Sequence, residues 1–376
     1  MTIETRRLLI IATFSLIVSG QCWACLWDYD TLAMERQRFP DAHELIAGHF
    51  VRHSPEYYKW RISDRTSKPV DQRTPIDFDD IAVAYDRLGQ HDAAIDTIRA
   101  KVERWPDERR YESEANLGTF HIHAGRFEEG LHHINKAIEI NPDAHFGREI
   151  YQKLLVEYVI ESQNGDHQLP LNDGVTFDGT GFAAFVLAAR KAEESDQPAE
   201  IQAAAKGILG MMRFGNHNSP ILLEALGDLL LYSRDDSKML AARAYLRASY
   251  EAGDSTASVA YRQKAQQAVK MQFGREIAEV EADLKTEIEQ GKSLFRQISD
   301  DEQAWIVSGR NLDVEFGNKY YEQPPLELNR PDWKPMDPVT RAALGLLRIL
   351  AAVFVGCGLV GVIAIRLIRR KKNRAT

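Results

Sequence analysis

The chain has 376 residues, of which 44% are hydrophobic and 27% are charged, and its formal net charge is −8. This composition is typical of a globular protein, and the length suffices for one large domain or two ordinary ones. An acidic chain lacks the basic surface that nucleic-acid binders carry, so we expect no nucleic-acid partner. The charge is uneven, because Asp337 is the last acidic residue and a basic cluster follows it.

The first 24 residues have the pattern of a secretory signal peptide. Two arginines precede an apolar run from Leu8 to Val18, and Cys22 and Ala24 form a small-residue cleavage site. A charged start, a short apolar stretch and small residues at the cleavage point are the three parts of such a signal. We therefore predict cleavage after Ala24. An uncleaved anchor and a lipoprotein signal that uses Cys25 are the alternatives.

Residues 343–366 are predicted to form one transmembrane helix. Ile349 to Ile365 carries no charge, and apolar residues on both sides extend the stretch to the thickness of a bilayer. Basic residues dominate the tail 367–376, and the positive-inside rule places such a cluster in the cytoplasm. We therefore predict a single-pass protein of the cytoplasmic (inner) membrane, with the bulk of the chain in the periplasm and the C-terminus in the cytoplasm. A buried core helix is the alternative for this stretch.

Residues 25–163 are expected to form an N-terminal helical domain. Short helices are predicted over 42–53 and from Ser54-Pro55 onward, because apolar residues recur at helical spacing after a capping residue. Ser63 to Pro75 is rich in polar residues and proline, which is typical of a connecting loop. The aromatic side chains of this part either cap the start of a helical array or form a ligand cradle; they are Trp27, Tyr29, Tyr57, Tyr58 and Trp60.

Residues 75–142 contain two copies of one helical hairpin, set 36 residues apart, as from Ala82 to Gly118. In each copy, apolar side chains recur at steps of three and four residues over two helices, which is the pattern of helices with one buried side. Gly89 ends the first helix of the first copy, and a proline closes each copy. The apolar residues of the first copy are Phe78, Ile81, Ala82, Tyr85, Leu88, Ala94, Ile95, Ile98, Val102 and Trp105.

Both copies resemble the tetratricopeptide repeat (TPR), a unit of about 34 residues with the pattern W-x2-L-G-x2-Y, later A-x3-F, and a closing proline. The unit 75–106 matches through Phe78, Ile81-Ala82, Tyr85, Ala94, Ile98 and Pro106. The unit 111–142 matches through Leu117-Gly118, His121, Gly130, Ile134 and Pro142. Glu114 occupies the tryptophan position of the second unit, which departs from the pattern.

The resemblance implies an all-α, helical-hairpin repeat solenoid of the membrane-anchored bacterial TPR type. In that family the first helices line a concave groove that binds a peptide or another protein, so the partner expected here is a protein or peptide of the cell envelope. The positions that the resemblance places in the groove, with exposed side chains, are Asp79, Val83, Asp86 and Arg87 in the first unit and Ala115, Thr119, Ile122 and His123 in the second.

The remaining segments are predicted from composition and periodicity. Residues 164–181 are rich in Asn, Asp and Gly, which predicts a long loop; residues such as Asn172 allow a calcium site as an alternative, although the Ca²⁺-loop pattern is absent.

Residues 182–308 are predicted as a second helical region with a degenerate TPR-like unit. Within it, 261–290 is predicted as one long helix that packs on the solenoid or pairs as a coiled coil. Residues 309–340 are proline-rich, which predicts an extended spacer or, alternatively, a partner-binding segment.

The sequence contains no nucleotide-binding, hydrolase or metalloprotease motif. Five histidines gather near the second hairpin, and imidazoles on facing helices can bind zinc or copper. Helical spacing does not oblige these side chains to converge, so we expect no metal site, no cofactor and no catalytic residue. The histidines are His121, His123, His132, His133 and His145.

Two classes of function are compatible with these sequence features. The favoured one is a non-catalytic adaptor, in which a helical-repeat domain outside the cytoplasmic membrane recruits a partner protein. The alternative is an envelope enzyme with its site in the second helical region, 182–308, or in the Gly/Asp-rich loop 164–181. An enzyme of this kind requires convergent carboxylates or histidines, and the sequence spacing does not predict any.

Overall fold

The computed structural model describes residues 40–163, 169–172, 181–232, 237–271 and 275–328. Within these ranges the chain is all-helical, with fourteen α-helices, two short 3₁₀ helices and no strand, so the predicted all-α class is confirmed. The predicted signal peptide (1–24), transmembrane helix (343–366) and basic tail (367–376) lie outside the described residues. Among the described helices, none is both long and apolar enough to cross a membrane.

The chain divides into two units, Met1–Glu327 and Leu328–Thr376, and all of the described helices belong to the first. Its first half contains α3 (Ala42–Ala47), α4 (Pro55–Ser67), η1 (Val70–Gln72), α5 (Pro75–Arg87), α6 (His91–Arg104), α7 (Arg110–His123), α8 (Phe127–Ile140), η2 (Ala144–Gly147) and α9 (Arg148–Gln163). Its second half contains α10 (Gly181–Arg190), α11 (Gln197–Phe214), α12 (Pro220–Tyr232), α13 (Lys238–Glu251), α14 (Ser255–Lys270), α15 (Ile277–Val307) and α16 (Leu312–Lys319).

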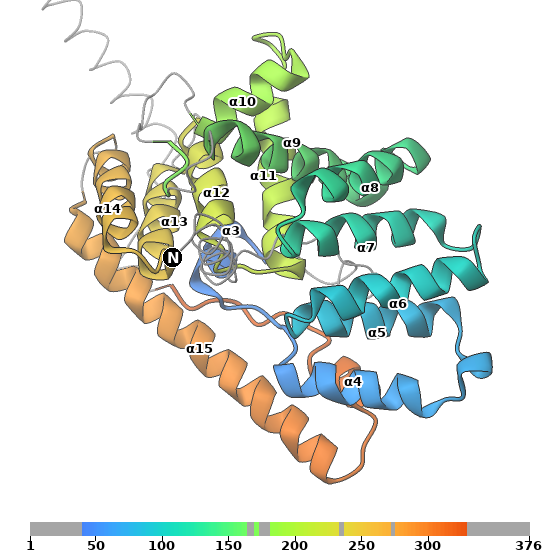
Figure 1. The fold of residues 1–376 in the computed structure, drawn as a ribbon. Helices are drawn as coiled ribbons and strands as arrows, with labels where there is room; N and C mark the ends of the chain where they lie inside the picture. The colour runs from blue at the N-terminus through green and yellow to red at the C-terminus, as the bar shows by residue number, and fades with distance from the viewer. Residues whose placement is uncertain (1–39, 164–168, 173–180, 233–236, 272–274, 329–376) are drawn as a thin grey trace, which may run out of the picture. The chain divides into compact units, whose positions relative to one another are not determined.

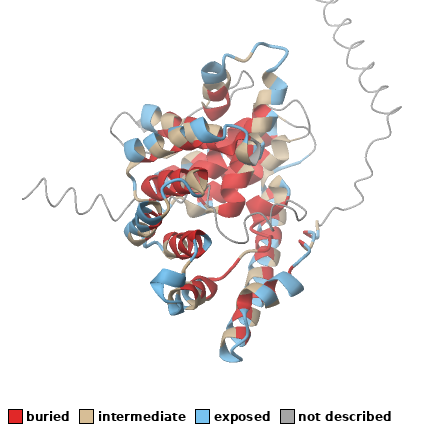
Figure 2. Ribbon diagram, turned by 90° about the vertical axis from the view of Figure 1, so that its right-hand side faces the viewer, coloured by how far each residue is buried: buried red, intermediate tan, exposed pale blue. Residues whose placement is uncertain are grey.

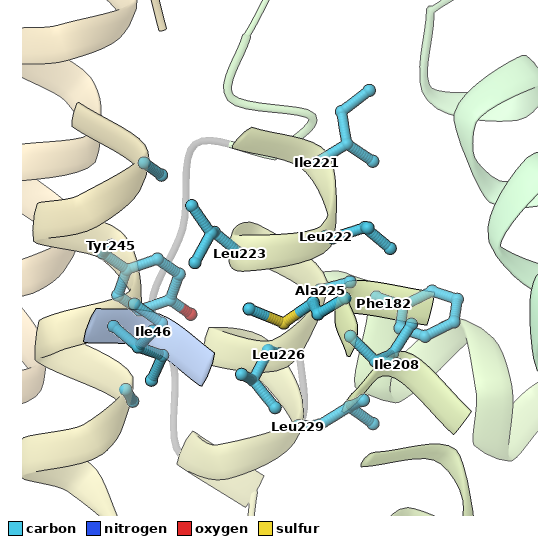
Figure 3. Close-up of a cluster of buried hydrophobic side chains, with 14 of the residues drawn as sticks. Ile46, Phe182, Ile208, Ile221, Leu222, Leu223, Ala225, Leu226, Leu229 and Tyr245 are labelled. Carbon is cyan, nitrogen blue, oxygen red and sulfur yellow. The ribbon is translucent and has the colours of Figure 1, made fainter. Parts of the chain in front are cut away.

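Most helices from α4 to α14 pack on their neighbours along the chain, which produces one continuous array (Figure 1). The pairs α5–α6, α7–α8 and α12–α13 are helical hairpins, and α9 connects the first two pairs to α11. Buried residues follow the inner sides of these helices, as Figure 2 shows. The larger core extends from α8 and α9 to α15 and also includes Ile46 of α3, which lies in the same cluster as Leu226 of α12 and Tyr245 of α13 (Figure 3).

The two hairpins predicted for 75–142 share one geometry. Their second helices, α6 and α8, both have 14 residues and begin 36 residues apart, at positions 91 and 127. The turns before them contain Gly89 and Gly125, also 36 residues apart, with φ angles of 74° and 75°. Glycine adopts this left-handed conformation at little cost, whereas a side chain at Cβ would strain it. The repeat seen in the sequence is therefore a repeat of backbone structure.

The long helix α15 and the short helix α3 close the inner side of the array. The 31-residue α15 contacts α3, α4, α13, α14 and α16, and Figure 1 shows that it runs from α14 to α4. Helix α3 contacts α11 and α13 as well as α15. Helices α3 and α15 therefore cover parts of α4, α11 and α13.

Polar contacts connect the segment 40–54 to α15 and to the residues that follow α16. His53 Nδ1 lies 2.7 Å from Glu302 Oε1, and the backbone N–H of Ser54 donates to the second oxygen of the same carboxylate at 2.9 Å. The backbone N–H of Leu326 donates to Glu44 Oε1 at 3.2 Å. The side chains of His53, Glu302 and Glu44 are all buried, so the closure depends on specific polar contacts as well as on apolar packing.

Several helix boundaries differ from the predicted ones. Helix α4 continues to Ser67, beyond the predicted loop start at Ser63. The predicted helix over 261–290 is two helices, because α14 ends at Lys270 and α15 begins anew at Ile277, where the carboxylates of Glu276 and Glu279 cap its first turn. Of the apolar stripe predicted for this helix, Val280, Leu284 and Ile288 are buried on α15, which contacts α3, α4 and α13.

Residues 309–340 were expected to form an extended spacer, but residues 312–319 of this segment form α16, which packs on the unit. Leu312, Phe316 and Tyr320 lie in one buried cluster with Tyr57 and Tyr58 of α4. This cluster assigns the two tyrosines to the packed end of the array and not to an open ligand cradle. Trp27 and Tyr29, from the same aromatic set, lie outside the described residues, as do residues 329–340 of the predicted spacer.

Candidate functional site

The side chains predicted to line a groove lie on α5 and α7, but they are not exposed. Seven of the eight are buried and Arg87 is half-buried, so their predicted exposure is wrong. The reason is that α5 lies among α4, α6 and α7, while α7 lies among α5, α6 and α8. The buried positions are Asp79, Val83, Asp86, Ala115, Thr119, Ile122 and His123.

Most of these side chains have an identified contact with another part of the same chain. Val83 belongs to the apolar cluster between α5, α6 and α7, and Ile122 belongs to the larger core. Thr119 Oγ1 accepts a hydrogen bond from the Gln152 side chain of α9 at 3.2 Å. Arg87 donates from its guanidinium to the hydroxyl of Tyr58 at 3.0 Å and to the backbone oxygen of Gly215. The predicted groove is therefore an intramolecular interface.

Asp79 is the most deeply buried of the charged positions. Lys101 Nζ on α6 donates to Asp79 Oδ1 at 2.7 Å, and Arg109 Nε, directly before α7, donates to Oδ2 at 3.0 Å. Burial raises the pKa of the Asp79 carboxyl, although both cations oppose this effect. Burial likewise lowers the pKa of Lys101, which Asp79 partly offsets. In this buried ion-pair group the two cations balance the charge of the Asp79 carboxylate, and the group joins α5 to α6 and to the start of α7.

Replacing Asp79 by alanine is expected to destabilise the protein by about 3–5 kcal/mol, because Lys101 would remain buried without its carboxylate. Urea unfolding followed by circular dichroism measures the change. Asp96→Ala is the matched control, since the Asp96 side chain on α6 is 75% exposed and its pair with Arg99 is a surface pair at 3.5 Å. The control should change stability by less than about 0.5 kcal/mol; equal effects of both substitutions would contradict the assignment.

A second group of charged and polar side chains surrounds Asp86 at the end of α5. His91 Nδ1, from the start of α6, lies 2.8 Å from Asp86 Oδ1. His123 Nδ1, from the end of α7, lies 2.9 Å from Oδ1 and 2.8 Å from Oδ2. Burial by itself raises the pKa of Asp86, but the interactions with His123 and His91 outweigh it and lower this pKa to about 2. Three helices thus meet at one ionised carboxylate.

Asp86, His91 and His123 are also of residue types that can ligate a metal ion, with one ligand atom from each lying within 4.8 Å of the others. The spacing of histidines along the sequence pointed only to the cluster from His121 to His145, and it missed Asp86 and His91 as members of a site. The 36-residue repeat did contain information about this site. It makes position 122 of the second hairpin equivalent to position 86 of the first, and His123, which follows position 122, therefore lies next to Asp86.

The four histidines of the predicted cluster whose side chains are described do not form one metal-ligating group. The rings of His121 and His133 stack with their centroids 5.5 Å apart, and His133 Nδ1 lies 2.6 Å from Glu114 Oε2. His132 is exposed, while His123 belongs to the separate group at Asp86. The side chain of the fifth, His145, lies outside the described residues.

His121 occupies the tyrosine position of the TPR pattern and is buried, and neither ring nitrogen has a hydrogen-bond partner among the described residues. Burial lowers the pKa of His121 to about 4, and Arg126, His133 and Arg99 act in the same direction. The native state therefore requires a neutral imidazole, while the unfolded chain binds a proton near pH 6.5.

Stability is expected to fall as the pH is lowered from about 6.5 to about 4, because the unfolded state binds more protons at His121 in this window. Protonation of His121 in the unfolded state contributes at most about 3 kcal/mol to this loss of folding free energy. His121→Leu should flatten the pH dependence of the urea midpoint between these values, and His132→Gln, at an exposed position, should leave it unchanged. A His121→Leu variant with the wild-type slope would contradict the prediction.

A third polar group lies in the second helical region. Glu224 and Asp228, one turn apart on α12, face Lys264 of α14, whose Nζ lies 2.7 Å from Glu224 Oε1 and 3.3 Å from Asp228 Oδ1. Tyr261 donates its hydroxyl proton to Glu224 at 2.8 Å, and Tyr245 donates to Asp228 at 2.6 Å. Burial raises the pKa of Glu224, while the two carboxylates raise the pKa of Lys264 despite its burial.

The same carboxylates hold the middle of the predicted loop 164–181 and the residue that directly follows it. The backbone N–H of Leu171 donates to Glu224 at 2.9 Å, and the backbone N–H of Phe182 donates to Asp228 at 3.0 Å. Asn172, which allowed a calcium interpretation, donates its side-chain amide to both carboxylates at 3.1 and 3.0 Å. A buried, hydrogen-bonded group of this kind anchors a loop to a helical array.

The chain matches no protein-family model, and comparisons with curated proteins and with solved structures give no match. Its function is therefore inferred from its own residues and their arrangement.

Proposed function

We propose that the chain is a non-catalytic scaffold of the TPR type, which is exported, tethered once to the cytoplasmic membrane, and binds a protein or peptide of the cell envelope. The observation that carries this proposal is the repetition of one hairpin in α5–α6 and α7–α8, with the same turn glycine and the same length of the second helix. Stacked helical hairpins build extended surfaces whose common use is the binding of other proteins.

The close approach of the paired helices also supports a TPR-type unit. A Cβ atom added to Gly118 of α7 would lie 2.6 Å from Ile134 Cδ1 of α8, and one added to Gly130 of α8 would lie 2.5 Å from Ile122 Cγ1 of α7. Both glycines stand at positions where the TPR pattern has small residues. The packing thus gives a physical reason for the residues on which the resemblance depends.

The enzyme alternative receives less support from the second helical region. Glu224, Asp228 and Lys264 are convergent and buried, which is a property of many active sites. Their carboxylate oxygens nevertheless accept hydrogen bonds from the backbone of Leu171 and Phe182 and from two tyrosines. These contacts give the group a structural role in anchoring the loop, so we place binding before catalysis.

The cellular location is proposed from the sequence at the two ends of the chain. The signal-peptide pattern of 1–24 directs the following residues out of the cytoplasm. The uncharged stretch within 343–366, followed by the basic tail 367–376, is the pattern of a stop-transfer helix with a cytoplasmic end. The helical unit 40–327 would then function in the periplasm.

Fusions of alkaline phosphatase, which is active only after export, test this topology. We expect high phosphatase activity when the enzyme follows Glu327 and background activity when it follows Thr376. Deletion of residues 1–24 from the first fusion is the control and should abolish its activity. High activity of both fusions, or activity of the deleted form, would contradict the proposed orientation.

Binding of a partner is tested by photo-crosslinking from the outer sides of the hairpins. Because the predicted groove is covered by the chain itself, the crosslinking amino acid is placed at the exposed positions Asp96 of α6 and Glu139 of α8. A scaffold is expected to give one discrete crosslinked product from both positions in native membranes, identified by mass spectrometry. Lys292, exposed on α15, serves as the matched position expected to give no such product. Absence of a discrete product from α6 and α8 would contradict the proposal.

A further inference from the structure

We propose that Asp86, His91 and His123 form a binding site for one divalent transition-metal ion, with Zn²⁺ as the best-matched ion, at the junction of the two hairpins. The site does not require the proposed scaffold function. It is built from three side chains of three helices, α5, α6 and α7, whose donor atoms face one another.

The geometry of the group resembles a compressed coordination shell. Both imidazoles direct Nδ1 toward the same carboxylate, with N–O separations between 2.8 and 2.9 Å, and the ring centroids lie 5.7 Å apart in an edge-to-face arrangement. Ligand atoms on a tetrahedral zinc ion, each about 2.0–2.1 Å from the metal, are separated by about 3.3 Å. An increase of about 0.5 Å in each N–O separation gives the spacing of such a shell, and the ligand atoms of all three residues already lie within 4.8 Å of one another.

The donor atoms determine the class of ion. Two imidazole nitrogens and one carboxylate oxygen suit zinc, cobalt, nickel and ferrous iron, whereas an all-oxygen shell would suit calcium or magnesium. Each imidazole coordinates through an unprotonated Nδ1, so its ring proton must lie on Nε2 when the ion is bound. A three-residue ligand set leaves a position for water or for a ligand from outside the chain.

The surroundings allow the ion to enter and hold the ligands in place. The side chains of Asp86 and His123 are 1% exposed, while that of His91 is 22% exposed and connects the group to solvent. His91 begins α6 two residues after Gly89, whose left-handed backbone fixes the turn between α5 and α6. An ion bound here would join the first hairpin to the second, in addition to the ion group at Asp79.

Cobalt and zinc binding to the purified full chain test the site. We expect one equivalent of Co²⁺ to bind with the visible absorption of a four- or five-coordinate centre, and Zn²⁺ to displace it. His91→Gln should weaken binding at least about 10-fold, and His132→Gln should bind as the wild type does, because His132 is an exposed histidine outside the group. No stoichiometric binding by the wild type, or equal binding by His91→Gln, would overturn the proposal.

A second measurement separates loss of ligands from loss of folding. Circular dichroism shows whether His91→Gln retains the helical content of the wild type. X-ray absorption at the zinc edge of the wild-type protein is expected to show two imidazole ligands and oxygen ligands only for the rest. A different number of imidazoles, or sulfur ligands, would overturn the assignment even if every variant failed to fold. Zn²⁺ should also raise the thermal midpoint of the wild type but not that of His91→Gln.

Discussion

Buried carboxylates determine how the first helices of this protein are held. Helix α5 alone buries Asp77, Asp79, Asp80 and Asp86. A buried carboxylate without a cation or hydrogen-bond donors would strongly destabilise the fold, so each must be matched by a neighbouring element. The partners come from both directions along the chain: Arg65 of α4 donates to Asp80 at 2.9 Å, Lys101 of α6 donates to Asp79, and His123 of α7 contacts Asp86. Charge compensation therefore fixes the register of four successive helices.

The same constraint operates in the second helical region, where it holds a loop as well as helices. Lys264 of α14 neutralises Glu224 and Asp228 of α12 across α13, whose Tyr245 contributes a hydroxyl group. The remaining acceptor sites bind Asn172, within the Gly/Asp-rich loop 164–181, and the backbone N–H of Phe182, directly after it. Apolar packing brings these helices together without much directional preference, whereas the polar groups select one arrangement.

The packing of α5 and α7 among α4, α6 and α8 changes the functional interpretation of the predicted groove, while α3 and α15 cover other helices of the array. An open TPR-like solenoid would present the first helices to a partner, but here Asp79, Val83 and Asp86 already have partners within the chain. Figure 1 shows α3 between the array and α15. The exposed surface of the hairpins is thus contributed mainly by α6 and α8, and the polar side chains of α5 are part of the structure that holds these helices in position.

Particular residues show which structural properties the sequence predicts and which it does not. The apolar stripe of Phe78, Ile81 and Ile98 was predicted to be buried and is buried, because helical periodicity expresses which side of a helix faces the core. The helical class and the glycine turns at Gly89 and Gly125 were likewise predictable, since they depend on residues within one or two helical turns of each other. Asp79 and Asp86 were expected to be exposed because the TPR resemblance places them in an open groove; their burial depends on Lys101 and His123, 22 and 37 residues away. Only the tertiary structure shows which sides of the helices are covered and that Asp86 contacts both His91 and His123. The physical reason is that burial and charge pairing depend on segments that come together only on folding.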